Sequence, residues 1–423
     1  MVRVDARNVL TNTMKQSKAL TILQSGKNVF LTGEPGAGKT YTINTFTDWL
    51  DESGICYAVT ASTGIAASHI NGSTIHSWSG IGIMKNLEEI DMNSIKYSKH
   101  AQKRILPAEV LILDEVSMLD SVFIDDLDKV LKEMHRNEDP FGGIQVVMVG
   151  DFFQLPPVSR DSEVKFAFES KAWQEADFNV CYLTEQHRQA DPIFTDMLRA
   201  MRFDTMTEDQ KNIIRSRISN GSAPTSLFTH NRDVDYMNTE KLKTLPGKEK
   251  KFHMMSTGDE RSITTLKKHC LSPETLILKK DAVVMFTANR PDKGYVNGSI
   301  GTVVNFSEEG HPMIKLIGGD GSIVFPQMNK WKSLDEKRQE KASISQLPLR
   351  LAWAITVHKS QGMSLDAASI DLSNAFEYGH GYVAVSRVRS LEGLHLIGVH
   401  KNAFKVNPKV LEQDKLFRES GVE

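Results

Sequence analysis

Residues 33–40 have the types and spacing that bind a triphosphate, reading Gly-Glu-Pro-Gly-Ala-Gly-Lys-Thr. Glycines let backbone N–H groups close around anionic oxygens without a Cβ in the way. Lys39 would place a positive charge on the β- and γ-phosphates, and the Thr40 hydroxyl would join the Mg²⁺ shell. The pattern predicts that nucleotide-binding residues run from the loop into the next helix: Gly33, Glu34, Pro35, Gly36, Ala37, Gly38, Lys39, Thr40 and Tyr41.

Two acids follow the apolar run at residues 110–113. A buried parallel strand normally excludes charge, so acids at its carboxyl end are expected beside a ligand. We expect Asp114 to hold Mg²⁺ and Glu115 to orient or polarise the attacking water. The alternative is a pair of surface acids at the end of a strand.

Three further side chains could complete a hydrolytic site. Gln154, in the stretch GDFFQLPPV, follows a predicted strand and could contact the γ-phosphate. Arg188 and Arg387 are candidate arginine fingers, which can raise the rate by about 10³–10⁵. The spacing alone leaves open that each arginine forms only a surface salt bridge.

The elements that would position these residues form two α/β patterns. In the first, short apolar runs at 28–32, 56–60, 110–113, 144–149 and 180–183 alternate with helical segments, one of them at 39–50 with Gly54 as its stop. This alternation predicts a parallel sheet covered on both faces. The second pattern has expected strands at 226–229, 367–372 and 394–398 and expected helices at 234–242 and 381–389.

Composition sets limits on the class of protein. The chain has 423 residues with a net charge of −2, so any DNA-binding face must be local. Two basic clusters are candidates, with solvated surface as the alternative for each: Lys96, Lys99, Lys103 and Arg104, and then Lys248, Lys250 and Lys251. No apolar run approaches the ~20 residues that span a bilayer, and the first ten residues lack the pattern of a signal peptide. The three cysteines are widely spaced, which suits a reducing compartment, and we expect a cytoplasmic protein, nucleoid-associated if bacterial.

Several stretches in order resemble the petite-integration-frequency (PIF) family of superfamily 1B DNA helicases. They are DEVSMLD (114–120), PFGGIQ (140–145), GDFFQLPPV (150–158), YVNGSIGTVV (295–304), QLPLRLAWAITVHKSQG (346–362) and GYVAVSRV (381–388). The resemblance spans roughly residues 16 to 398. Pro35 and Ala37 replace small or hydroxyl residues that are common in the family's phosphate loop. We identify the chain as similar to a minimal bacterial or phage-type member.

The resemblance implies an α/β fold with two RecA-like parallel-sheet motor cores. The first core would comprise residues 1–68 and 101–190, with a small insertion at 69–100 that carries the strand-separating wedge. The second would comprise 191–255 and 346–423, with a β-barrel-like (SH3-like) insertion at 256–345.

The resemblance also implies roles for individual residues. Gln16 matches the glutamine that reads adenine, and Lys39, Thr40, Asp114, Glu115, Gln154, Arg188 and Arg387 match the ATPase positions. Expected DNA contacts are Thr60, Thr63, Gly64, His76, Trp78, Phe152, Asn297, Gly298, Thr356, His358, Lys359 and Gln361. For Trp78, Phe152 and the neighbouring Phe153 we consider base stacking, with packing inside the protein as the alternative.

The implied activity is ATP hydrolysis, with Mg²⁺, coupled to 5′→3′ movement on single-stranded DNA and unwinding of duplex. The expected partners are single-stranded DNA and forked duplex, with G-quadruplex and RNA–DNA hybrid as further substrates. The expected roles lie in DNA replication, repair, recombination or telomere maintenance, and we expect no membrane and a monomer in isolation. Rival readings are a RecD-like helicase, a nucleotide-gated switch that binds DNA without processive movement, and a ring-forming protein remodeller.

Overall fold

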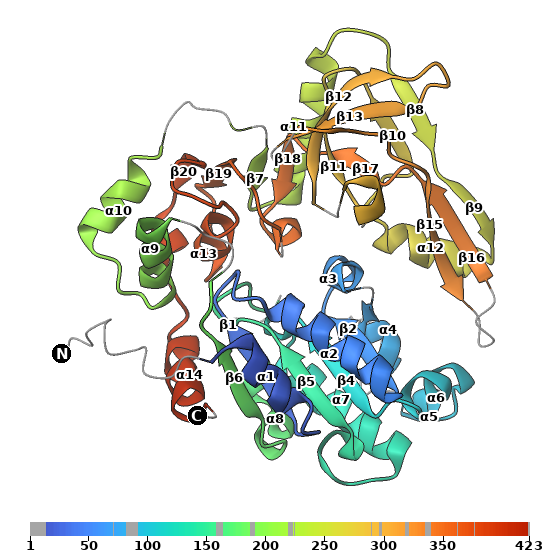
Figure 1. Cartoon of the computed structure of the whole chain (residues 1–423), viewed down its shortest axis with the longest axis vertical. Helices are drawn as coiled ribbons and strands as arrows, with labels where there is room; N and C mark the ends of the chain where they lie inside the picture. Colours follow the sequence, from blue (N-terminus) through green and yellow to red (C-terminus); the bar gives the residue numbers. More distant parts are fainter. Residues whose placement is uncertain are drawn as a thin grey trace. The chain divides into compact units, whose positions relative to one another are not determined.

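The computed structural model describes residues 14–70, 72–81, 92–157, 164–186, 191–218, 223, 225–288, 290–295, 298–317, 321–334, 340–361, 363–375 and 377–421. The chain forms two compact units (Figure 1). The first unit comprises residues 1–212, 376–386 and 401–423, and the second comprises 213–375 and 387–400. The polypeptide therefore passes from one unit to the other four times, at 212/213, 375/376, 386/387 and 400/401.

A parallel six-stranded sheet forms the centre of the first unit. Its order is β3 (Ser73–Thr74), β2 (Tyr57–Ala61), β4 (Val110–Asp114), β5 (Gln145–Val149), β1 (Val29–Gly33) and β6 (Asn179–Leu183). Each pair of neighbours is parallel, so the carboxyl ends of all six strands meet at one edge. Ligands bind at this edge in open α/β sheets.

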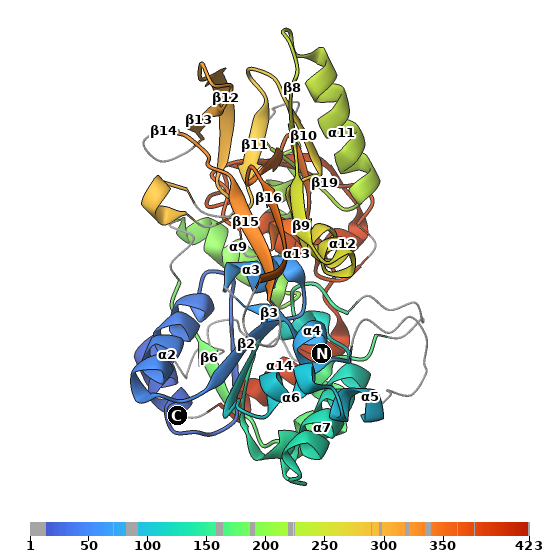
Figure 2. The same cartoon turned by 90° about the vertical axis from the view of Figure 1, so that its right-hand side faces the viewer.

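Alternating side chains place apolar residues on both faces of this sheet. Val29 and Leu31 of β1 join one buried cluster with Phe46 and Leu50 of α2 (Lys39–Ser53) and Leu23 of α1 (Gln16–Leu23). Figure 2 shows α2 and α7 (Ser121–His135) on opposite sides of the strands. Gly54, with φ of 69°, ends α2 as predicted, because its left-handed conformation favours glycine.

The opposite face carries an aromatic cluster. Phe30 of β1 lies 4.9–5.4 Å, between ring centroids, from Phe152, Trp173 and Phe417. Phe417 belongs to α14 (Pro408–Glu419), which we predicted to be part of the second core. The structure corrects that assignment: α14 packs against β6 in the first unit, as the aromatic contacts require.

Most of the remaining helices of the first unit are short, and α9 is the longest of them. They are α3 (Gly64–His69), α4 (Ile75–Ser79), α5 (Met92–Lys96), α6 (Lys99–Ile105), α8 (Lys171–Glu175), α9 (Pro192–Arg202) and α13 (His380–Val385). The 3₁₀ turns are η2 (Val116–Met118), η3 (Pro140–Gly143), η4 (Ala167–Glu169) and η7 (Lys401–Phe404). The predicted helix at 381–389 is thus only the short α13, which the structure assigns to the first unit; α10 (Glu208–Arg215) crosses the boundary between the units.

The second unit contains a smaller parallel sheet in the order β18 (Ala354–Thr356), β7 (Ser226–Phe228), β19 (Ala368–Leu372) and β20 (Leu394–Val399). Helix α11 (Asn231–Thr244) packs on β18. Asn238 of α11 joins the two elements with both ends of its side-chain amide, donating to the Ala354 carbonyl and accepting from the Ala354 N–H.

Among its described residues, the second unit also contains three antiparallel sheets, formed by strands within the predicted insertion at 256–345 and on either side of it. The largest has the order β14 (Ile323–Val324), β13 (Pro312–Leu316), β12 (Ile300–Phe306), β11 (Val283–Phe286) and β17 (Leu349–Leu351). The others are β15 (Asn329–Leu334), β16 (Glu340–Gln346) and β9 (Met255–Gly258), and the pair β10 (Thr275–Leu278) and β8 (Lys250–His253). One helix, α12 (Glu260–His269), and two 3₁₀ turns, η5 (Pro291–Lys293) and η6 (His358–Ser360), complete the unit.

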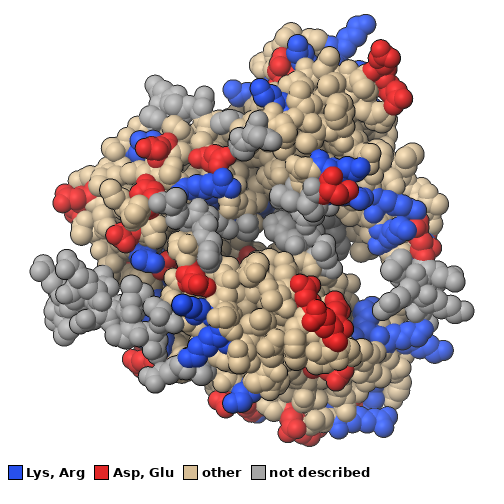
Figure 3. All heavy atoms as spheres, viewed as in Figure 1, with Lys and Arg blue, Asp and Glu red and all other residues tan. Residues whose placement is uncertain are grey.

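Basic and acidic side chains are interspersed over the face shown in Figure 3, in keeping with the small net charge. Two members of the predicted basic group have partners inside the first unit. Lys96 pairs with Glu133, and Arg104 donates from Nε to the Trp78 carbonyl at 3.2 Å. Among the described residues, no helix has the length and apolar character that a membrane span requires.

Candidate nucleotide-binding and DNA-contacting site

The predicted phosphate loop connects β1 to α2. Gly36 and Gly38 have φ of 89° and 87°, values that L side chains rarely adopt. A Cβ on Gly33 would lie 2.5 Å from the Leu183 carbonyl oxygen of the neighbouring strand, so this position has no room for a side chain. The three glycines therefore shape the loop as the sequence predicts.

The Lys39 ammonium lies within this loop. It donates to the Gly33 carbonyl at 2.8 Å and to the Glu34 carbonyl at 3.3 Å. Burial lowers the pKa of Lys39, while the carboxylates of Asp151 and Glu115 act in the opposite direction. Asp114 acts in the same direction as Glu115, so the lysine is close to both of the acids that were predicted to act with it.

Asp114 ends β4, two strands along the sheet from β1. Its Oδ1 accepts from the Glu115 N–H at 2.8 Å, and Glu115 itself has a left-handed backbone with φ of 54°. Burial raises the pKa of the Asp114 carboxyl, with the Glu115 N–H and Lys39 opposing that shift. A desolvated carboxylate beside a lysine would be stabilised further by a cation.

Gln154 follows β5, the strand between β4 and β1, as predicted. Its side chain is 6% exposed, and Nε2 donates to Oδ2 of Asp151 at 3.3 Å. Asp151 also accepts at Oδ1 from the Phe153 N–H at 3.1 Å. The loop that carries Gln154 is thus folded around the Asp151 carboxylate.

Gln16 begins α1 beside the phosphate loop. Its Nε2 donates to the Ala37 carbonyl at 3.3 Å, and its backbone N–H donates to Glu185. Thr40 and Tyr41 lie in the first turn of α2, where both are exposed, Tyr41 to 66%. The structure therefore brings the predicted adenine reader and the phosphate loop together.

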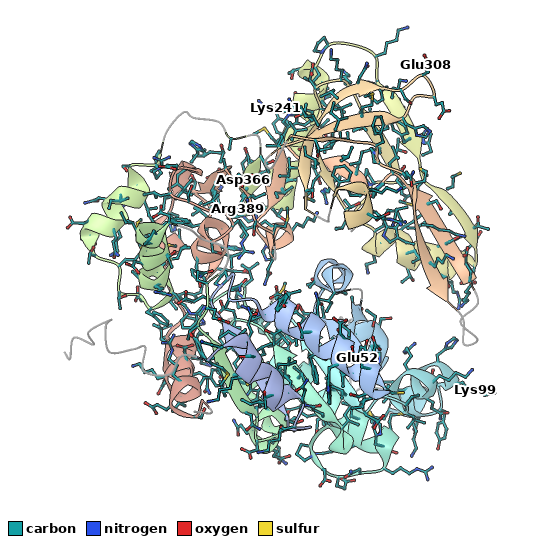
Figure 4. The ribbon with its side chains drawn as sticks, viewed as in Figure 1. Glu52, Lys99, Lys241, Glu308, Asp366 and Arg389 are labelled. Carbon is teal, nitrogen blue, oxygen red and sulfur yellow. The ribbon has the colours of Figure 1, made fainter. Side chains whose placement is uncertain are left out.

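Arg387 lies in the second unit, in a segment fixed by the loop that carries Leu365. The Leu365 N–H donates to the Arg387 carbonyl at 2.8 Å, and the Arg389 N–H donates to the Leu365 carbonyl at 3.1 Å. Asp366 and Arg389, labelled in Figure 4, form an ion pair at 2.8 Å. The Arg387 side chain is 1% exposed and contacts the Ser360 carbonyl from Nη1 at 3.5 Å, so it is a buried arginine and not a surface one.

Arg188, the other candidate finger, lies outside the described residues, as does Asn297. Part of the expected wedge segment 69–100, namely residues 71 and 82–91, is also outside them. These three expectations stay predictions.

The chain was compared with known proteins. The model of the PIF1-like helicase family matches residues 6–218. The ATP-dependent DNA helicase Pif1 of Psychrobacter sp. is 39% identical over 97% of this chain and 72% of that protein. The Pif1 helicase of Bdellovibrio bacteriovorus is 35% identical over 95% of this chain and 91% of its own length. The chain belongs to the PIF1-like helicase family.

Solved structures agree with this assignment. Bacteroides sp. Pif1 in complex with ADP-AlF4 has a TM-score of 0.81 and 29% identity, covering 96% of this chain and 97% of that one. The same helicase bound to single-stranded DNA has a TM-score of 0.67, 30% identity and 95% coverage of both chains. The chain spans 61–63% of the length of the human, mouse, rat, Xenopus and zebrafish Pif1 helicases that it matches. As a PIF1-like helicase it is an enzyme that uses ATP to act on DNA, and the predicted pair of RecA-like cores fits the observed parallel sheets.

In this PIF1-like helicase, several residues of the first unit that were expected to contact DNA make contacts within the protein. Thr60 is fully buried and donates from Oγ1 to the Ile112 carbonyl of β4 at 2.8 Å. Thr63 caps α3 by accepting from the Ala66 N–H at 3.2 Å, which places Gly64 at the first helical position. His76 is half-buried, with its ring 4.5 Å from that of Phe123, and burial lowers its pKa, which Asp120 opposes.

The aromatic candidates for base stacking are packed inside the protein. Trp78, Phe152 and Phe153 are 4–6% exposed. Phe152 contacts five other aromatic rings, and the Phe153 ring lies 4.1 Å from the guanidinium of Arg202. The packing alternative therefore describes these side chains in this structure better than stacking on DNA does, and a DNA contact by Trp78 or Phe152 stays a prediction.

The late motif residues lie close together at the carboxyl end of β18. Thr356 is 2% exposed and accepts at Oγ1 from the Lys359 N–H at 3.2 Å, which shapes η6. Burial lowers the pKa of His358 and of Lys359, and Gln361 is 7% exposed. Gly298, with φ of 91°, packs against Met363 in the same unit. The Thr356 and Gln361 side chains are thus buried in this structure.

Asp151, Arg199 and Arg202 are not among the predicted site residues, but all three lie in ion pairs beside the site. Arg202 is 1% exposed and donates from Nη1 to Oδ2 of Asp151 at 2.6 Å, and Arg199 donates from Nε to both oxygens of Glu34, at 3.1 and 3.3 Å. The pairs are separated by 51 and 165 residues, so no local pattern could have revealed them.

Proposed function

We propose that this PIF1-like helicase moves 5′→3′ along single-stranded DNA and unwinds duplex, with each step driven by ATP hydrolysis at the phosphate loop. One observation carries the proposal: Lys39, Asp114, Glu115 and Gln154 all follow strands whose carboxyl ends share one edge of the first sheet. This is the position that phosphoryl transfer requires, because catalysis there consists mainly of orientation and charge stabilisation.

Mg²⁺ fits the residues present. Thr40 offers a hydroxyl and Asp114 a carboxylate, the hard oxygen ligands that Mg²⁺ prefers. The carboxylate of Asp114 is desolvated, as the raised pKa of this group indicates, and a divalent cation would compensate for that burial. When bound, the ion would neutralise charge on the β- and γ-phosphates.

The side chains divide the remaining work. Gln16 holds the adenine, Lys39 binds the phosphates and Glu115 orients the attacking water. Gln154 contacts the γ-phosphate and responds to its loss. Arg188 and Arg387 supply positive charge to the transition state, as arginine fingers do in related phosphoryl transfer.

Single-stranded DNA and forked duplex are the proposed partners. The structure of Bacteroides Pif1 bound to single-stranded DNA supports the first, and a structure of two Pif1 helicases at forked double-stranded DNA supports the second. The segments around Thr63, His76 and Lys359 would contact the backbone of the strand, which carries no sequence information. G-quadruplex and RNA–DNA hybrid are proposed as further substrates, and the isolated protein is proposed to be monomeric.

The test is an unwinding assay on duplexes with a single tail. A 5′ tail should support ATP-dependent strand separation and a 3′ tail should not, with Lys39→Ala as the inactive control. Unwinding only from a 3′ tail would overturn the polarity. ATP hydrolysis with DNA binding but no strand separation from either tail would favour a nucleotide switch.

A further inference from the structure

We propose that Arg202 is a positioning residue for ATP hydrolysis, which fixes the Asp151 carboxylate and through it the side chain of Gln154. The inference rests on the proposed contact between Gln154 and the γ-phosphate. It assigns a function to a side chain of α9 that lies outside the phosphate loop, the two acids and the candidate fingers.

The Asp151 carboxylate organises the loop after β5. It is fully buried, and it accepts from the Phe153 N–H on Oδ1 and from the Gln154 side chain on Oδ2. The Gln154 backbone N–H also donates to the Asp151 carbonyl at 2.9 Å. Oδ2 is shared between Gln154 and Arg202, so the arginine determines where that oxygen lies.

Arg202 is itself held on several sides. Nη1 donates to Tyr382 Oη at 3.2 Å as well as to Asp151, and Nη2 donates to Tyr182 Oη at 3.0 Å. Its guanidinium also lies over the Phe153 ring. A planar fork can make these bonds together, whereas a lysine ammonium cannot reproduce their geometry. All of these partners belong to the first unit.

The same helix also holds the phosphate loop. Arg199, one turn before Arg202, donates to both oxygens of Glu34. One rigid element, α9, is therefore ion-paired to the loop that binds the phosphates and to the loop that carries Gln154. Since a misplacement of about 1 Å can cost 10²-fold in rate, fixing both loops from one helix is a catalytic advantage.

Stability alone does not account for the Arg202–Asp151 pair. Removing two charges from water is costly, and buried ion pairs can often be replaced by apolar residues without loss of stability. A pair at this depth is better explained by its position, with the Asp151 carboxylate near Lys39 and bonded to Gln154. The two side chains are at most 1% exposed, so little water can compete for the shared oxygen.

The test is a double-mutant cycle on the full chain, read by steady-state ATP hydrolysis with single-stranded DNA. Arg202→Lys should lower kcat by about 10-fold with the KM for ATP changed less than about 3-fold, since the phosphate loop is retained. Gln154→Ala should also lower kcat. The double variant should be no slower than Gln154→Ala alone, because Arg202 acts through that side chain.

Arg418→Lys is the matched control. Arg418 donates to Tyr182 and Asp414 in the same polar cluster, and neither acceptor belongs to the loop that carries Gln154. It should cost a similar shift in Tm and leave kcat near that of the unchanged chain. A fall in kcat with Arg418→Lys equal to that with Arg202→Lys would assign the effect to stability and overturn the proposal.

The outcomes separate the two hypotheses. If Gln154→Ala is slow and Arg202→Lys is not, or if their losses multiply in the double variant, the positioning role of Arg202 is wrong while the role of Gln154 stands. If Gln154→Ala keeps the full rate, the proposed γ-phosphate contact fails first and the inference fails with it. If Arg202→Lys does not fold, Tyr382→Phe is the substitute, because it removes one hydrogen-bond partner of the arginine. It should lower kcat about 2-fold, and it should not lower kcat further when combined with Gln154→Ala. An unchanged kcat in Tyr382→Phe, or losses that multiply in the double variant, would overturn the inference.

Discussion

Lys39 and Asp114 are charged side chains placed where burial disfavours their charged forms. Lys39 donates to two carbonyls of its own loop, which are weaker acceptors than phosphate oxygens. A ligand that brings negative charge and one that brings a cation would each relieve one of these costs. The charged forms of Lys39 and Asp114 are therefore less stable in the empty site than they would be with MgATP bound. Such unfavourable placement of charge is typical of functional positions.

Lys39→Ala should lower the rate of ATP hydrolysis by at least about 100-fold, because it removes a positive charge from the β- and γ-phosphates. Binding to single-stranded DNA should change little, since no expected DNA contact includes this residue. Phosphate release and fluorescence anisotropy measure the two properties. A variant that hydrolyses ATP at the normal rate would contradict the assignment of the phosphate loop.

Asp114→Asn should raise the Tm of the metal-free protein at neutral pH while abolishing most hydrolysis. The pKa of Asp114 is raised by burial, so the ionised carboxylate destabilises the fold as pH rises from the unfolded value through the raised one. The variant has no such charge, so the gain in Tm should grow over that pH range and vanish in acid.

The check is thermal unfolding of both proteins at matched pH values, with EDTA present. An equal Tm difference at acid and neutral pH would show that the carboxylate is not desolvated. Addition of Mg²⁺ and nucleotide should then stabilise the unchanged chain more than Asp114→Asn.

At the scale of elements, α14 completes the first unit although it comes from the end of the chain. Phe417 packs into the aromatic cluster of Phe30 and Phe152, and Asp414 accepts from Tyr182 of β6 at 3.0 Å. The edge strand β6 is thereby covered on the face opposite α1 and α2. The loop that carries Gln154 begins beside this cluster, so the packing of α14 bears on the site.

Phe417→Ala should reduce the free energy of unfolding by about 3–5 kcal/mol, the usual cost of removing a buried aromatic ring. Leu416→Ala is the control, because that side chain is 52% exposed and its loss should cost less than about 1 kcal/mol. Denaturant unfolding followed by tryptophan fluorescence reports both, since Trp173 lies in the cluster. Equal losses would mean that α14 does not pack as described.

The sequence predicted strands well and tertiary partners poorly. Each predicted strand of the first sheet begins and ends within one residue of an observed strand. Short apolar runs between helical segments are typical of buried parallel strands, which makes such strands predictable. It missed β18 (Ala354–Thr356), three residues long, since so short a run has no periodicity. It also placed α14 with the second core, because proximity along the chain was the only guide.

The same distinction holds for the candidate site. Lys39, Asp114, Glu115 and Gln154 were predictable because each lies in a local motif with a chemical reason. Arg202 was not, since its role depends on a partner 51 residues away. The sequence left packing and base stacking open for Phe152, because an aromatic pattern does not distinguish an exposed ring from a packed one.

At the scale of the whole molecule, the residues proposed for one reaction come from both units. Lys39 belongs to the first unit and Arg387 to the second. We expect DNA binding to control whether Arg387 takes part in hydrolysis, as in enzymes whose activity is gated by a conformational step.

Single-stranded DNA should therefore stimulate ATP hydrolysis by at least about 10-fold, and Arg387→Ala should remove most of that stimulation. Hydrolysis would be measured with and without a short oligonucleotide for both proteins, with Arg389→Ala as the control because Arg389 already pairs with Asp366. A rate indifferent to DNA in the unchanged chain would count against a motor.

The four passages of the chain between the units limit how the protein can be divided. A protease cut at 212/213 would give two fragments with no covalent link between them. Because α13 and α14 of the second fragment pack on α9 and β6 of the first, the nicked protein should stay together on a sizing column under native conditions. A fragment that ends at residue 212 would lack α13 and α14 and would expose Phe30 and Trp173, making it prone to aggregate. Supplying the missing helices as a separate peptide could restore solubility, which would make this enzyme suited to fragment complementation instead of simple truncation.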